Sequence, residues 1–169
     1  MKIIISPAKK MQRKEEEVFE ITRPVFYREA CCLREQMKQM ELEDLKVLWS
    51  CNEKIARENQ ERLRLYEMDK NLTGAVIAYE GIQYQYMAPQ VFTERQWEYI
   101  KGHLRILSGL YGLLGPQDGV IPYRLEMQAK LQIGEHKDLC SFWGDRLYRE
   151  LTREDRTILN LASKEYSKA

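Results

Sequence analysis

The sequence predicts an α/β (α+β) fold in which a mixed central sheet is flanked by helices. Two short apolar runs near opposite ends of the chain, residues 2–5 (KIII) and 157–161 (TILNL), are typical of buried strands. Between them, apolar residues recur at intervals of three and four, which favours amphipathic helices. With 169 residues, of which 44% are hydrophobic and 31% charged, the chain is long enough for one domain with its own core.

The charge balance gives the chain no general attraction to nucleic acid. The net charge is +1, from 27 basic and 26 acidic residues, so any DNA binding must come from a local patch. The apolar runs are too short to cross a bilayer, and the N-terminal residues lack a signal-peptide pattern. We therefore expect a cytoplasmic protein without a membrane partner.

The motifs that usually mark metal sites and enzymes do not occur in this sequence. The four cysteines form no C-x-x-C pair, and neither histidine lies near them, so we expect no metal and no cofactor. A phosphate-binding Walker loop, a dinucleotide fingerprint and a G-x-S-x-G nucleophile are all missing. These observations favour a non-enzymatic protein.

The first half of the chain predicts one strand and then helices. The strand at residues 2–5 ends at Ser6-Pro7, and an exposed loop is expected at 12–23. Helical periodicity covers residues 26–40 and 41–66, and whether a break near Ser50 divides the second stretch stays open.

The second half predicts two more strands and two more helices. Residues 72–79 (LTGAVIAY) form an apolar run that we interpret as a strand ending at Glu80-Gly81. Thr93 and Gln96 form a capping box for a helix that carries apolar residues as far as Leu107. Residues 125–133 fit helix or strand equally, Asp138 is placed to cap a further helix, and 157–161 is the third strand.

Residues 104–127 combine unusual backbone with polar side chains, which is typical of functional loops. The expected helix runs into Gly109-Leu110-Tyr111-Gly112, and this arrangement resembles a helix-hairpin-helix element around residues 93–115. In such hairpins, backbone N–H groups approach a phosphate irrespective of base sequence. A tight connector between packed elements is the alternative. The candidate DNA- or phosphate-binding residues here are Lys101, Arg105, Ser108, Gly109, Tyr111, Gly112 and Arg124.

A second candidate site lies where the predicted strands end. Lys9 follows the first strand and Lys164 follows the third, and ligands bind at the carboxyl ends of parallel strands. Together with Arg124, these lysines form a candidate cleft for a phosphate or a carboxylate. Glu126 is best interpreted as a structural ion-pair partner of Arg124 rather than a general acid.

Four segments carry a family resemblance: IIISPAKKM, LRILSGLYGLL, IPYRLEM and LNLASKEYSKA. They resemble the YaaA family of peroxide-stress resistance proteins. The resemblance implies a bacterial, cytosolic role in surviving hydrogen peroxide, with damage from free iron limited and DNA bound through a helix-hairpin-helix feature and a positively charged cleft. Lys9 is the residue that matches the lysine of the family's Ser-Pro-Ala-Lys segment.

The chain also departs from the family pattern. Ile82 replaces an acidic residue, and Gly115 replaces an arginine that often precedes the proline, which removes one charge from the proposed patch. Family members continue beyond residue 169, so we expect residues 1–169 to form a single YaaA-like domain that lacks the family's C-terminal portion.

Two functions follow. The first is a DNA-binding stress protein whose partner is double-stranded DNA. The alternative is an enzyme that acts on a phosphorylated or nucleotide-like small molecule at the strand-end cleft.

Overall fold

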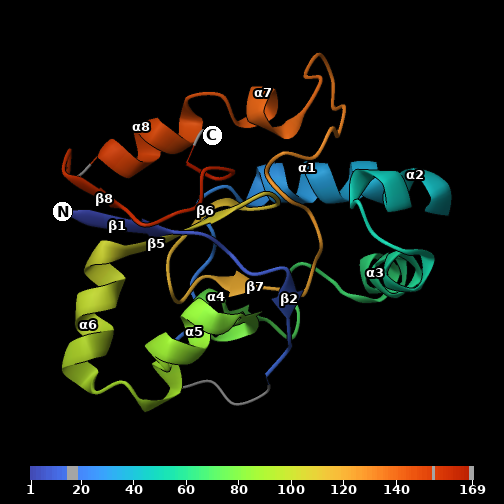
Figure 1. The fold of residues 1–169 in the computed structure, drawn as a ribbon. Coiled ribbons are helices and arrows are strands. Elements are labelled where there is room, and N and C mark those ends of the chain that lie inside the picture. Colours follow the sequence, from blue (N-terminus) through green and yellow to red (C-terminus); the bar gives the residue numbers. More distant parts are fainter. Residues whose placement is uncertain (15–18, 154, 168–169) are drawn as a thin grey trace.

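The computed structural model describes residues 1–14, 19–153 and 155–167. Its central sheet has the strand order β6-β5-β1-β8. The central strands β1 (Lys2–Ile5) and β5 (Leu104–Ser108) are parallel, and β8 (Ile158–Asn160) pairs in parallel with β1. β6 (Gly112–Leu114) is antiparallel to β5. The predicted mixed sheet and its first and third strands are therefore confirmed (Figure 1).

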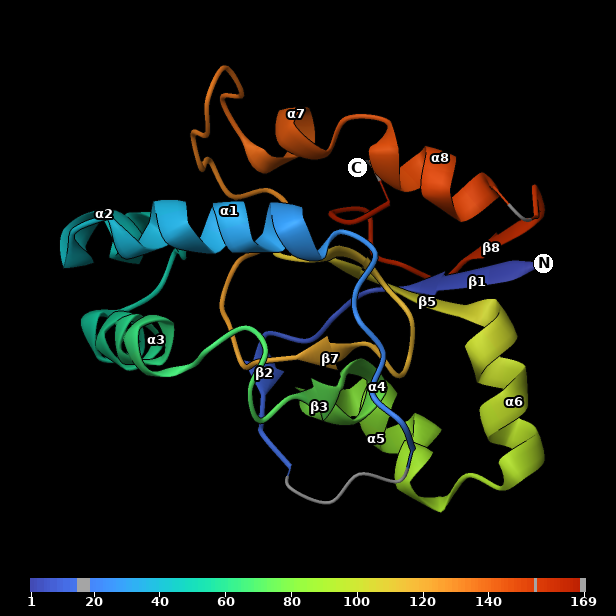
Figure 2. The same ribbon diagram turned by 180° about the vertical axis from the view of Figure 1, so that it is seen from behind.

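Helices cover both sides of this sheet. α7 (Leu139–Trp143) and α8 (Arg146–Thr152) lie on one side, and α5 (Ile82–Met87) and α6 (Glu94–His103) lie on the other (Figures 1 and 2). Asp138 caps α7 as expected, by accepting a hydrogen bond from the Ser141 N–H. The helix expected after it is divided in two, because Gly144 adopts a positive φ of 52° that a regular helix cannot contain.

Three helices, α1 (Tyr27–Lys38), α2 (Leu42–Leu48) and α3 (Glu53–Leu65), form a separate layer beside the sheet (Figure 2). The sequence left a break near Ser50 open, and the structure has one. Ser50 has a φ of 45°, and Asn52 begins α3 by accepting a hydrogen bond from the Ile55 N–H at 3.0 Å.

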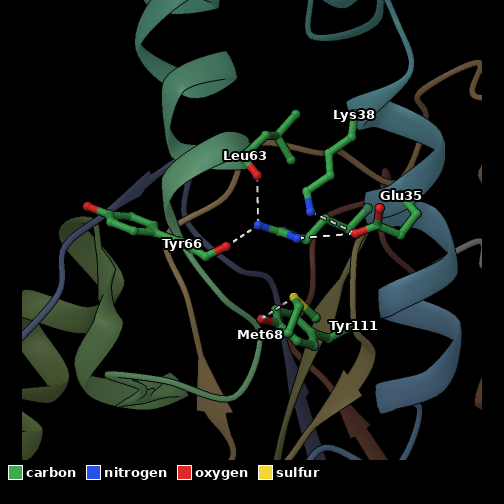
Figure 3. A network of polar contacts seen from close by, with 7 residues as sticks. Glu35, Lys38, Leu63, Tyr66, Met68 and Tyr111 are labelled. Atoms are coloured by element: carbon green, nitrogen blue, oxygen red, sulfur yellow. Dashed lines mark hydrogen bonds and ion pairs between the residues drawn. The ribbon is translucent and has the colours of Figure 1, made fainter.

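A buried arginine joins α1 to the end of α3. Arg34 is 4% exposed and donates to the carbonyl oxygens of Leu63, at 2.7 Å, and Tyr66 (Figure 3). These carbonyls lie at the C-terminal end of α3, where backbone acceptors lack helical partners and a positive charge is favourable. Beside them, the Tyr111 hydroxyl contacts the Met68 sulfur at 3.8 Å.

The expected strand at residues 72–79 is mostly wrong. Only Thr73–Gly74 (β3) and Tyr79–Glu80 (β4) are extended, and Ala75–Ala78 forms the helical turn α4. β3 pairs with β7 (Gly119–Val120), and β4 pairs with β2 (Lys10–Met11). All four residues of α4 are buried, so the run has no periodicity by which a strand could be told from a buried helix.

The expected helix-hairpin-helix element is also wrong. The capping box of Thr93 and Gln96 is present, but α6 ends at His103 and residues 104–108 form β5. Lys2 Nζ donates to the Gly102 carbonyl at 2.9 Å, and Arg105 donates to the Lys101 carbonyl at 3.1 Å, so both cap the end of α6. The apolar residues that looked like a continued helix instead fill a strand paired on both edges.

Three smaller points complete the fold. Residues 125–133, where helix and strand were both open, form neither element, and a short 3₁₀ helix, η1, spans Pro89–Val91. In the expected loop at 12–23, Thr22 bridges to Asp118, and residues 15–18 lie outside the described part of the chain. Within the described residues, no helix has the length and apolar character needed to span a membrane.

Candidate functional site

The carboxyl ends of β1, β5 and β8 lie along one edge of the sheet, because these strands are parallel. Two serines join the ends of β1 and β8. The Ser163 N–H donates to Ser6 Oγ at 2.8 Å, and the Ser6 hydroxyl donates to Ser163 Oγ at 3.2 Å. The predicted convergence of strand ends is therefore present for the first and third strands, although residues 72–81 pair outside this sheet.

Lys9 and Arg124 meet at this edge over a shared carboxylate. Lys9 Nζ lies 3.0 Å from Glu126 Oε1, and Arg124 Nη2 lies 3.5 Å from the same oxygen. Arg124 Nε also donates to the Trp49 carbonyl at 3.3 Å. The side chains of Arg124 and Glu126 are each 14% exposed, whereas that of Lys9 is 66% exposed. The space between the two cations is filled by Glu126, and the adjoining cavity measures only about 20 Å³.

The turn after β8 brings a second carboxyl group to the same place. Burial raises the pKa of Glu165, the negative charge of Glu126 raises it further, and Lys9 opposes both effects. Glu165 Oε1 is buried and accepts no hydrogen bond from the described residues. Lys164 is exposed in this turn. We call Lys9, Arg124, Glu126 and Glu165 the strand-end cluster.

Tyrosine hydroxyls form a buried network beneath the strand-end cluster. The Tyr123 hydroxyl lies 2.7 Å from the Tyr79 hydroxyl and 2.6 Å from Ser108 Oγ. The Tyr84 hydroxyl donates to the Ser6 carbonyl at 2.8 Å. Burial raises the pKa of Tyr123 to about 12, so its hydroxyl stays protonated and has one proton to donate within this network. Sequence reasoning gave Tyr79 and Tyr84 no role here, and the ten tyrosines of the chain were the available signal.

The glycine hairpin is interior. Ser108, Leu110 and Tyr111 are 0% exposed, and Gly109 and Gly112 are buried beside them. A side chain at Gly109 would collide with the Leu125 carbonyl, so this glycine allows two backbones to approach closely. The hairpin residues that were predicted to bind a phosphate are therefore packed inside the fold. The alternative prediction, a tight connector between packed elements, describes them better.

Lys101 and Arg105 lie at the opposite end of the sheet. Both line an open pocket of about 310 Å³ near the start of β1 and β5. Five of its lining residues are basic and two are acidic, and we call it the cationic pocket. The predicted site residues therefore divide between two places, since Arg124 belongs to the strand-end cluster. The basic residues of the cationic pocket are Lys2, Arg23, Lys101, Arg105 and Arg153.

Asp118 shows how burial and charge act in the cationic pocket. Its carboxyl accepts a hydrogen bond from the Thr22 hydroxyl at 2.7 Å and another from the Gly115 N–H at 2.7 Å. Burial raises the pKa of Asp118, while these two hydrogen bonds and the charge of Arg105 lower it. Among the described residues, no group of three or more His, Cys, Asp or Glu comes together as metal ligands do.

Comparison with known proteins places the chain in a family. A family model described as "Peroxide stress protein YaaA" matches residues 1–169. The chain belongs to the YaaA family. UPF0246 proteins of Pediococcus pentosaceus and Agathobacter rectalis are 53% and 52% identical to it over 169 and 168 residues. The matched regions cover 100% and 99% of this chain but 67% and 68% of those relatives. The chain thus spans about two thirds of their length.

Proposed function

We propose that this YaaA-family chain acts in the response to hydrogen peroxide by binding double-stranded DNA non-specifically and limiting iron-dependent damage. The observation that carries the proposal is the cationic pocket, where basic side chains from four separate segments line one open surface. The peroxide role is that of the family, and DNA binding is the finer inference that we add.

Exposed ion pairs in this pocket are suited to exchange with phosphates. Lys101 Nζ lies 2.7 Å from Glu98 and is 39% exposed, and Arg153 lies 3.4 Å from Glu150 and is 67% exposed. Surface pairs of this kind contribute roughly 0–1 kcal/mol each, so a phosphate can replace the carboxylate at little cost. Arg105, by contrast, is held by the Lys101 and Leu104 carbonyls and positions the end of α6.

Neutralising the DNA phosphates would also protect the DNA from iron-dependent damage. Lysine and arginine side chains that bind DNA phosphates release the cations condensed on the duplex. Iron cations released in this way no longer sit beside the sugars and bases that their peroxide chemistry damages. Protection of this kind needs no iron ligand on the protein.

The test measures duplex binding by fluorescence anisotropy against salt concentration. The double variant Lys101→Ala/Arg153→Ala should lower the slope of log affinity against log salt by roughly two, because each phosphate contact contributes about 0.9. The matched control is Lys54→Ala/Arg64→Ala, which removes two exposed charges from α3. Absence of salt-dependent binding by the unaltered chain, or an equal loss in the control, contradicts the proposal.

The second candidate function is the enzymatic one at the strand-end cluster. The observation in its favour is that Lys9 and Arg124 converge at the carboxyl edge of parallel strands, which is where α/β proteins bind ligands. Turnover of a phosphorylated small molecule that is lost in Lys9→Ala would support it. The cationic pocket is not needed for this activity, so the two functions are tested independently.

A further inference from the structure

A groove adjoins the strand-end cluster on the side of α2. It measures about 620 Å³, within the range of roughly 300–1,000 Å³ typical of small-molecule sites. Glu126 lines both this groove and the small cavity beside Lys9, so the two spaces share one carboxylate. The other lining residues are Met40, Asp44, Val47, Leu48, Trp49, Ser50, Gln128, Ala129 and Lys130.

The groove has an apolar wall and a buried donor. Val47, which is 78% exposed, and the partly buried Met40 and Leu48 supply apolar surface of the kind that receives the body of an organic ligand. Trp49 is 2% exposed, and its indole Nε1 is buried without a hydrogen-bond partner among the described residues. Because protein atoms enclose it, this donor offers no contact to a ligand in the groove.

Arg124 lies between this wall and the strand-end cluster, and with Lys9 it lines the small cavity that shares Glu126 with the groove. Its guanidinium bonds the Trp49 carbonyl on one side and pairs with Glu126 on the other. Its side chain is only 14% exposed, so its position is set by the surrounding structure. A planar guanidinium fixed in this way is suited to recognise a phosphate or carboxylate.

The contact between Lys9 and Glu126 is of a kind that exchanges easily. Glu126 Oε1 lies 3.0 Å from Lys9 Nζ, yet it is buried and accepts no hydrogen bond with suitable geometry from the described residues. Charge alone therefore holds the pair, and Lys9 itself is 66% exposed. Glu126 thus occupies the place on Lys9 and Arg124 that an anionic ligand would take.

We propose that this groove binds a nucleotide-like phosphate monoester, whose phosphate replaces the Glu126 carboxylate on Lys9 and Arg124 while its ring lies along the apolar wall. Glu126 then acts as an internal competitor. The inference rests on the second candidate function, of which it specifies the ligand and the residues, and it requires binding alone.

Isothermal titration calorimetry of the whole chain tests the proposal. Adenosine 5′-monophosphate is the probe. Adenosine has its ring but lacks the phosphate, and inorganic phosphate has the charge but lacks the ring. We expect the monophosphate to bind at least about tenfold more tightly than either half, because only it uses both the wall and the cations. Equal affinities for the three probes, or no binding of the monophosphate, overturn the proposal.

Three variants assign the residues. Lys9→Ala should weaken binding of the monophosphate about tenfold, because one charged partner is lost. Lys10→Ala is the matched control, since Lys10 is the next residue and is 80% exposed. Its Nζ lies 2.9 Å from Glu80, which does not line the groove. Glu126→Gln should strengthen binding several-fold because the competing charge is removed.

The gain in Glu126→Gln cannot come from misfolding, so it separates competition from structural damage. Weaker binding in Glu126→Gln, or an equal loss in Lys9→Ala and Lys10→Ala, overturns the proposal. Binding without turnover supports this inference and contradicts the enzymatic function.

Discussion

The two ends of the central sheet hold basic residues in contrasting states. At the carboxyl edge, Arg124 is 14% exposed and is fixed by Glu126 and the Trp49 carbonyl. At the opposite end, Lys101 and Arg153 are 39% and 67% exposed, and each pairs with an acidic residue three positions earlier in the chain. A charge that is buried and fixed can select one ligand, whereas exposed charges act through their number and are screened by salt.

The largest difference between the two ends is expected in how much a glycine substitution changes the free energy of unfolding. Gly109→Ala places a methyl group against the Leu125 carbonyl and should lower the free energy of unfolding by about 3 kcal/mol, because both contacting groups belong to buried backbone. Gly102→Ala, near the cationic pocket, meets nothing within 4 Å and should be neutral or stabilise α6 by about 0.5–1 kcal/mol. Urea denaturation of both variants checks the pair, and equal effects would remove this contrast.

The hydroxyl network should give the next largest effect. Tyr123→Phe leaves Ser108 and Tyr79 without their buried partner and should lower the free energy of unfolding by about 1–3 kcal/mol. Tyr148→Phe removes a hydroxyl from a residue that is 63% exposed and should change it by less than about 0.5 kcal/mol. Thermal denaturation of the two variants measures the difference, and an unaffected Tyr123→Phe would show that the network is energetically neutral.

The pH dependence of the strand-end cluster should give the smallest effect. Burial and Glu126 raise the pKa of Glu165 above its ordinary value of 4.5. A carboxyl whose pKa is raised on folding stabilises the folded state at low pH and loses that contribution as pH rises through the folded-state pKa. The stability of the unaltered chain relative to Glu165→Gln should therefore fall as pH rises from 4.5.

The cause of this shift can be checked separately. Repeating the pH series in a Glu126→Gln background should reduce the dependence, because one of the two causes of the raised pKa is then missing. A dependence of the opposite sign would mean that Lys9 outweighs both burial and Glu126.

Local signals in the sequence identified many elements correctly. The predicted capping residues Thr93 and Asp138 begin α6 and α7, because a cap bonds N–H groups only three residues away. The Asn52 cap of α3 was not predicted, and it supplies the reason for the break near Ser50. The prediction for segment 72–79 failed because full burial of residues 75–78 erases the periodicity on which such predictions depend. The prediction for 104–108 failed because the apolar residues of this strand also fit the spacing of the preceding helix.

The candidate site was predicted in part. Lys9 and Arg124 were expected at one strand-end cleft, and they do converge there, because the parallel arrangement of β1, β5 and β8 gathers strand ends at one edge. Lys101 and Arg105 were grouped with Arg124 through their proximity in sequence, but the turn from α6 into β5 carries them to the other end of the sheet. The groove beside Trp49 had no sequence signal, since it is formed by segments about 75 residues apart.

The fold class, the capped starts of α6 and α7, the first and third strands and the family could all be predicted from the order of the amino acids. These depend on local hydrogen bonds, side-chain spacing and uninterrupted motifs, all of which are written along the chain. Only the three-dimensional arrangement shows that the glycine hairpin is interior, that Glu126 lies between two cations and that the basic residues form two surfaces. Each of these depends on which distant segments are brought together and which groups lose contact with water.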